Sequence, residues 1–328
     1  MRLLSSGLAL GSVCLLLAGC GSKNNDDTIT IEGRPSDRYQ MTLDIQPVPS
    51  AKKESRMKTT LLKRDSELPP RELQIVHERV IHNFIINKDF SSFSHIHHED
   101  FQALTEDDLE KATLHFPYTF PKSGSYRMVS EFTHRGRSRI KHFDIQVGNN
   151  TNSEPIINLS REKQFGDFEA TLTLVPPTPT ENSVTHMNIH ISEQGVPVKD
   201  VEMYLGSEVH LALWRIDGKF FGHSHALTSH MEKMFNHMSS RDVSPSRRAE
   251  MMAEMMINMG DQTQKQEFFG PDVPVRYIFP TEGVYVLFFQ IAIDEVARTF
   301  DFMIDVSESR SQGNGFTSSD YQPQQLSQ

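Results

Sequence analysis

Short runs rich in hydrophobic, β-branched and aromatic residues recur along this chain, and polar stretches with Pro, Gly, Asp and Asn separate them. Short runs of this composition with turn-forming residues between them are typical of β-strands. The first half of the chain has seven such runs, at residues 39–45, 57–62, 80–86, 92–97, 114–120, 125–132 and 140–147. Short strands at this density predict a β-sandwich of the immunoglobulin type.

The second half of the chain repeats this pattern, with runs at 168–174, 184–192, 209–216, 220–225, 275–279, 284–293 and 299–306. A repeat of this length indicates duplication of a whole domain. We therefore expect an all-β protein of two tandem Ig-like β-sandwich domains with a Met-rich helical insertion in the second. The expected boundaries are a signal peptide at 1–20, a flexible tether at 21–37, sandwiches at 38–148 and 165–306, a linker at 149–164, an insertion at 228–266 and a disordered tail at 307–328.

Histidines are the second repeated feature. His82, Phe93, His95 and His97 recur at the same offsets as His210, Phe221, His223 and His225, and Phe120-Pro121-x-x-Gly124-x-Tyr126 recurs as Phe279-Pro280-x-x-Gly283-x-Tyr285. Because side chains alternate along a strand, each His-x-His pair projects two imidazoles to one side. A hairpin would bring the earlier histidine across from the pair and complete a three-nitrogen site for Cu(II) or Zn(II).

A structural interpretation of the same histidines stays open. They can brace the hairpin through hydrogen bonds to carbonyl or carboxylate oxygens, and duplication preserves structural residues too. The two interpretations differ in geometry, because ring nitrogens more than roughly 5 Å apart cannot share an ion.

The second copy contains about 31 extra residues between its last histidine and its Phe-Pro strand, and this insertion is rich in methionine. Thioether sulfur is a soft ligand that suits Cu(I), and pairs three and four residues apart share one side of a helix. Alternatively, a helix over 247–260 packs its methionine stripe as a lid or onto a partner. The candidate ligands are Met231, Met234, Met238, Met251, Met252, Met255, Met256 and Met259.

The N-terminus predicts export and lipidation. A basic Arg2, an apolar stretch over 8–17 and the box Leu17-Ala18-Gly19-Cys20 have the pattern of a bacterial lipoprotein signal, with Cys20 as the lipidated residue. Gly21 favours the outer membrane over the inner one in enteric-type bacteria. The exported chain then has no free thiol, so a metal would need His, Met, carboxylate or backbone ligands.

One stretch of the second copy resembles a known family. Pro197-Val198, Tyr204-Leu205-Gly206, His210 and then Phe221-Gly222-His223-Ser224-His225 are similar to exported bacterial Ig-like domains described as YtkA-like or heavy-metal-associated. The resemblance covers about residues 166–306 and, in a more diverged form, 39–148. The chain departs from the family pattern at His98 and Ala226, where a proline usually follows the last histidine, and at Val209, where a glycine is usual. The resemblance implies an Ig-like fold and an association with copper or heavy metals.

We therefore expect a periplasm-facing envelope lipoprotein that binds copper, or else zinc, for metal buffering, resistance or handover. The competing hypothesis is a structural lipoprotein whose Ig-like domains and Met-rich helix dock onto an envelope partner. A net charge of −10 and the lack of a concentrated basic run argue against nucleic acid as a partner. The sequence contains no GxSxG, HExxH, Walker or Rossmann motif, so we do not expect an enzyme or an organic cofactor.

Overall fold

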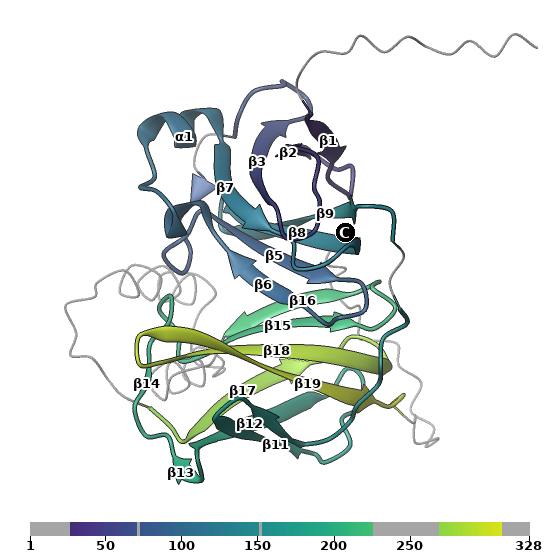
Figure 1. Cartoon of the computed structure of the whole chain (residues 1–328), viewed down its shortest axis with the longest axis vertical. Helices are drawn as coiled ribbons and strands as arrows, with labels where there is room; N and C mark the ends of the chain where they lie inside the picture. The colour runs from purple at the N-terminus through teal and green to yellow at the C-terminus, as the bar shows by residue number, and fades with distance from the viewer. Residues whose placement is uncertain (1–26, 71–72, 151–152, 226–268, 310–328) are drawn as a thin grey trace, which may run out of the picture.

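The computed structural model describes residues 27–70, 73–150, 153–225 and 269–309, and the structural statements below concern these residues. We call residues 27–150 the N-terminal half and residues 153–309 the C-terminal half. Every strand pairing in both halves is antiparallel, and the sheets stack along the long axis of the molecule (Figure 1). No helix in the described part of the chain is long and apolar enough to span a membrane.

The N-terminal half consists of two facing sheets. The outer sheet has the order β1-β2-β3-β7, with strands β1 (Ile29–Glu32), β2 (Tyr39–Gln46), β3 (Glu54–Lys63) and β7 (Thr113–Thr119). The inner sheet contains β4 (Leu73–Gln74), β5 (Ile81–Asn87), β6 (Phe93–Ile96), β8 (Gly124–His134) and β9 (Arg137–Val147), with β8 between β5 and β9. A short 3-10 helix, η1 (His98–Asp100), and helix α1 (Glu106–Lys111) connect β6 to β7.

The C-terminal half repeats this arrangement. Its outer sheet contains β10 (Glu162–Phe165), β11 (Phe168–Val175), β12 (Val184–Glu193), β13 (Val196–Pro197) and β17 (Asp272–Ile278). Its inner sheet contains β14 (Val201–Glu202), β15 (His210–Arg215), β16 (Phe221–His225), β18 (Gly283–Ile293) and β19 (Val296–Val306). All fourteen predicted runs correspond to strands, which confirms the all-β fold.

The burial of side chains along a strand differs between the outer and the inner sheets. In β2, buried and partly exposed residues alternate, because one face packs on a core and the other faces solvent. In β5 every residue is buried, and in β15 every residue but the last is buried. These inner strands pack on their own half with one face and on the opposite half with the other.

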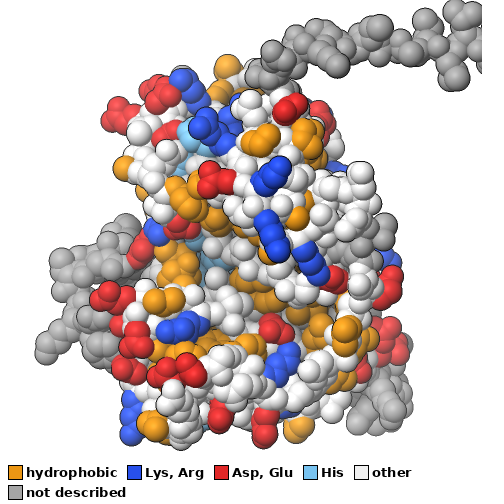
Figure 2. Space-filling model, viewed as in Figure 1, with side chains coloured by type: hydrophobic (Ala, Val, Ile, Leu, Met, Phe, Trp, Pro, Cys, Tyr) orange, Lys and Arg blue, Asp and Glu red, His pale blue; other side chains and the backbone are white. Residues whose placement is uncertain are grey.

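The junction of the two halves has a hydrophobic core of its own. Phe84 of β5 and Trp214 of β15 are both fully buried in it, and Phe93 of β6 stacks on Phe288 of β18 with ring centroids 4.4 Å apart. The space-filling view shows hydrophobic side chains gathered where the halves meet (Figure 2). The junction therefore resembles a protein interior, in which groups are shielded from water and held in fixed positions.

The structure corrects three predicted boundaries. The tether predicted over 21–37 is wrong for Ile29–Glu32, because these residues form β1 and the side chains of Ile29 and Ile31 pack on the core. The linker predicted over 149–164 ends earlier, because Glu162 starts β10. The tail predicted from 307 begins at least one residue later, because the Ser307 amide donates to the Pro179 carbonyl oxygen at 2.9 Å. The Met-rich helical insertion lies within 226–268, outside the described residues.

Candidate metal centre

The β5–β6 hairpin brings the first three predicted histidines together. Phe84 of β5 is paired with His95 of β6. Because the strands are antiparallel, His82, two residues before Phe84, lies at the level of His97, two residues after His95. The Nδ1 atom of His82 lies 3.0 Å from the Nε2 atoms of both His95 and His97, and those two Nε2 atoms are 2.9 Å apart. We call these three residues triad 1. All three are buried.

In each imidazole of triad 1, one ring nitrogen faces the other two histidines and the other faces away from them; we call these the inner and the outer nitrogen. Each outer nitrogen has an oxygen acceptor. His82 Nε2 lies 3.0 Å from the Val76 carbonyl oxygen, and His97 Nδ1 lies 2.9 Å from a carboxylate oxygen of Asp100. His95 Nδ1 lies 2.7 Å from Oε1 of Gln290, on β18 of the opposite half. Since a neutral imidazole has one N–H, these three acceptors place the hydrogen on the outer nitrogen of each ring.

Each inner nitrogen of triad 1 then carries no hydrogen, and the three lone pairs point at one another. They cannot hydrogen-bond among themselves, and together they form a chelating set. Bonds of about 2.0–2.1 Å to nitrogens 3.0 Å apart require angles of about 95° at the ion. Three such bonds occupy one face of an ion, which leaves the other face for water or another ligand.

Burial keeps these imidazoles neutral. Burial first, and then the neighbouring histidines, hold the pKa values of His82 and His95 well below their usual value. Burial also lowers the pKa of His97, although the Asp100 carboxylate opposes this effect. Neutral imidazole is the form that binds metal, so proton competition at neutral pH is small.

The β15–β16 hairpin forms the second group, triad 2. His210 is paired with His225, and Ala212 is paired with His223. His210 Nδ1 lies 3.4 Å from His223 Nε2, and one ring nitrogen from each of the three histidines lies within 4.8 Å of the other two. Nε2 of His225 is buried without a hydrogen-bond partner. Burial and the nearby histidines hold the pKa values of His210 and His225 well below normal.

Two outer nitrogens of triad 2 follow the same scheme. His210 Nε2 lies 2.8 Å from the Tyr204 carbonyl oxygen, which corresponds to the contact of His82 Nε2 with the Val76 carbonyl oxygen at 3.0 Å. His223 Nδ1 lies 2.7 Å from Oε2 of Glu131, on β8 of the opposite half. Burial would raise the pKa of Glu131, but His223 and Ser138 hold it below the ordinary carboxyl value.

Sequence reasoning missed four residues of this region, namely Asp100, Glu131, Gln290 and His77. The His77 ring stacks on that of His225, with centroids 3.6 Å apart, although the two residues belong to different halves. Burial first, then His223, lowers the pKa of His77 to about 4. A detectable signal existed for Gln290, because it is the single polar residue in the apolar run 284–293.

The remaining predicted site residues lie outside the described part of the chain. These are the lipidation site Cys20 and the thioether candidates Met231, Met234, Met238, Met251, Met252, Met255, Met256 and Met259. Their roles stay predictions.

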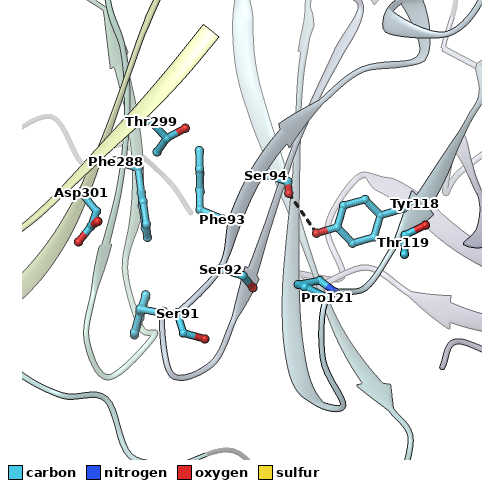
Figure 3. Close-up of a pocket in the computed structure, with 11 residues that line it drawn as sticks. Ser91, Ser92, Phe93, Ser94, Tyr118, Thr119, Pro121, Phe288, Thr299 and Asp301 are labelled. Carbon is cyan, nitrogen blue, oxygen red and sulfur yellow. Dashed lines mark hydrogen bonds between the residues drawn. The ribbon is translucent and has the colours of Figure 1, made fainter. Parts of the chain in front are cut away.

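A separate cavity of about 470 Å³ opens at the edge of the junction. It lies between Phe93 of β6 and Phe288 of β18, whose rings are parallel in Figure 3, and extends to Tyr118, which bonds the Ser94 hydroxyl at 3.1 Å. No histidine lines this cavity, so it is distinct from both triads.

Among solved structures, the chain is similar to fibronectin(III)-like modules of Clostridium thermocellum CbhA, at 13% identity over 84% of this chain and 99% of that one, with a TM-score of 0.20. It is also similar to Escherichia coli alpha-2-macroglobulin activated by porcine elastase, at 10% identity over 86% of this chain and 26% of that one, with a TM-score of 0.22. The D0-D1 domain of Intimin matches at 8% identity over 85% of this chain and 100% of that one, with a TM-score of 0.19. A comparison with curated proteins found no match.

A family model described as "Domain of unknown function (DUF8832)" matches residues 34–149 and, a second time, residues 163–308. Each matched segment contains one complete histidine triad. The two matches together cover most of the chain, which therefore belongs to the DUF8832 family.

Proposed function

We propose that this protein is a copper-binding lipoprotein of the bacterial cell envelope, whose two histidine triads hold metal for buffering, resistance or handover. The observation that carries the proposal is the set of three inner nitrogens of triad 1, which lie 2.9–3.0 Å from one another. Ring nitrogens this close meet the geometric condition for sharing one ion.

The hairpin-bracing alternative accounts for only half of this arrangement. Hydrogen bonds to Val76, Asp100 and Gln290 explain the outer nitrogens of the rings. They leave the inner nitrogens as buried lone pairs facing one another, which is unfavourable unless a cation lies between them. Acceptors on the outer nitrogens also orient the rings and increase their basicity, as the outer partners of metal-bound histidines do.

The donor set favours copper, with zinc as the alternative. Imidazole nitrogen suits both ions, and divalent copper binds more tightly than divalent zinc at a given nitrogen site. The envelope location rests on the lipoprotein signal in the sequence and on the resemblance to heavy-metal-associated exported domains. In the methionine-rich insertion, the thioethers provide soft ligands for Cu(I).

The test is metal binding by purified residues 21–328. Equilibrium dialysis against Cu(I), Cu(II) and Zn(II) gives the stoichiometry and affinity of the parent protein, of His82/His95/His97→Ala, of His210/His223/His225→Ala and of a chain lacking 231–259. His186/His190→Ala is the matched control, because these histidines are more exposed than the triads and lie on the outer sheet.

Tight copper binding that each triad variant reduces, and that the control leaves intact, is the expected result. Weak, nonstoichiometric binding that is unchanged in every variant would contradict the proposal. The next experiment would then be a pull-down for an envelope partner of a structural lipoprotein.

A further inference from the structure

The two triads lie against each other across the junction of the halves. The ring centroids of His82 and His223 are 5.6 Å apart, and that of His95 lies 5.7 Å from those of both His210 and His223. The His210 and His223 rings, which belong to one triad, are also 5.6 Å apart. The shortest spacing between the triads therefore equals the longest spacing between rings within triad 2.

Each triad is also completed by a residue of the opposite half. Gln290 of the C-terminal half accepts a hydrogen bond from His95, and Glu131 of the N-terminal half accepts one from His223, each at 2.7 Å. Glu131 is paired with His82 across β8 and β5, and Gln290 is paired with His210 across β18 and β15. Glu131 and Gln290 therefore occupy equivalent positions, next to the triad that they do not support.

The surroundings hold the two triads in this arrangement. Phe84 of β5 stacks on His95 with centroids 4.2 Å apart, and the same ring lies 4.7 Å from that of His223. Phe84 belongs to the apolar cluster of the junction, so water is excluded from one side of both triads. His77 adds a further contact across the junction through its stacking on His225.

We propose that the two triads form one paired metal centre, which binds two ions side by side, and that Glu131 and Gln290 are positioning residues that each act on the triad of the opposite half. This inference rests on the proposed function. An ion about 2 Å from its ligand nitrogens lies about 3 Å from their ring centroids, so the two ions are at most about 12 Å apart.

The first test is electron paramagnetic resonance of the protein loaded with two equivalents of Cu(II). Two unpaired spins within this distance couple through their magnetic dipoles, which broadens each other's signals and shortens their relaxation times relative to an isolated ion. Each triad→Ala variant, loaded with one equivalent, is expected to give the spectrum of an isolated Cu(II) ion. Two bound ions whose spectrum equals the sum of the two single-triad spectra would overturn the paired centre and leave the metal-binding function standing. Absence of stoichiometric binding would refute both.

The second test uses the hydrogen bonds that Gln290 and Glu131 each accept from the triad of the opposite half. With triad 2 removed by His210/His223/His225→Ala, Gln290→Ala should weaken Cu(II) binding at triad 1 about 10–100-fold, whereas Glu131→Ala should leave it unchanged. With triad 1 removed instead, Glu131→Ala should weaken binding at triad 2 and Gln290→Ala should not. Glu131→Gln and Gln290→Glu retain an acceptor oxygen and should restore most of the affinity.

The crossed pattern separates positioning from a general loss of structure. Equal weakening of both triads by either alanine substitution, or no weakening by either one, would overturn the positioning roles. Circular dichroism of each variant, before metal is added, identifies a variant that fails to fold, and for such a variant the acceptor-retaining substitution is the decisive comparison.

Discussion

Copper bound at both triads is expected to raise the midpoint of thermal unfolding by about 8 °C. An ion that binds only the folded protein stabilises it by about 2.7 kcal/mol when its free concentration is 100 times the dissociation constant. With one such site at each triad, as proposed, the total is about 5 kcal/mol at that concentration. For a chain of 328 residues, an unfolding entropy of about 2.1 cal/mol/K per residue means that each kcal/mol raises the midpoint by about 1.5 °C.

Differential scanning calorimetry at a buffered free copper concentration measures this shift. The variant His82/His95/His97→Ala should retain about half of it, because only triad 2 remains. The variant that lacks both triads should show no shift, and the matched control His186/His190→Ala should show the full one. The metal-free midpoint of each variant serves as its own reference, since the substitutions themselves change stability.

A shift of equal size in the parent protein and in the variant lacking both triads would refute the reasoning, because the stabilising ions would then bind elsewhere. A complete loss of the shift on removal of one triad would have a different meaning. It would indicate that neither triad binds an ion without the other.

Three further predictions concern stability. Trp214→Ala should reduce the free energy of unfolding by about 3–5 kcal/mol in urea titrations, because its fully buried side chain joins the apolar cluster of the junction. Burial, then Arg127 and Arg34, lowers the pKa of His142 to about 4, so the unfolded chain takes up a proton near pH 6.5 that the folded protein does not. Stability should therefore fall by up to about 3 kcal/mol between pH 6.5 and pH 4, and His142→Asn should remove that part of the loss in urea titrations at the two pH values. Thr105→Ala should cost about 1 kcal/mol by the same titration, because the Thr105 hydroxyl accepts from the Asp108 amide at the start of α1.

The strands and the composition of each triad were predictable from local patterns. Alternation with a period of two locates the outer strands, and His-x-His in a strand aims both rings to one side whatever the rest of the fold does. The partner histidine was predictable as well, because a hairpin pairs neighbouring strands. Four-residue β1 was missed because a run as short as Ile29–Glu32 contains too few alternations to stand out from a polar segment.

The junction was not predictable in the same way. Glu131 and His223 are 92 residues apart in sequence, and His95 and Gln290 are 195 apart, so no local period connects them. The indirect signal, present for Gln290 and absent for Glu131, is a polar residue in an inner strand whose sequence neighbours are apolar. Burial of such a residue requires a partner, but the sequence does not say that the partner lies in the other half.

The hydrogen bonds from His95 to Gln290 and from His223 to Glu131 have the form of contacts in a symmetric dimer. In a twofold interface, residue i of one subunit contacts residue j of the other, and j of the first contacts i of the second. Here one pair of equivalent positions, Glu131 and Gln290, contacts the other pair, His223 and His95, in that reciprocal way. The two halves thus pack as two copies of one subunit would, and the chain connection keeps them together at any concentration. Because each half supplies the acceptor for a histidine of the other half's triad, neither half by itself contains all the contacts of its triad.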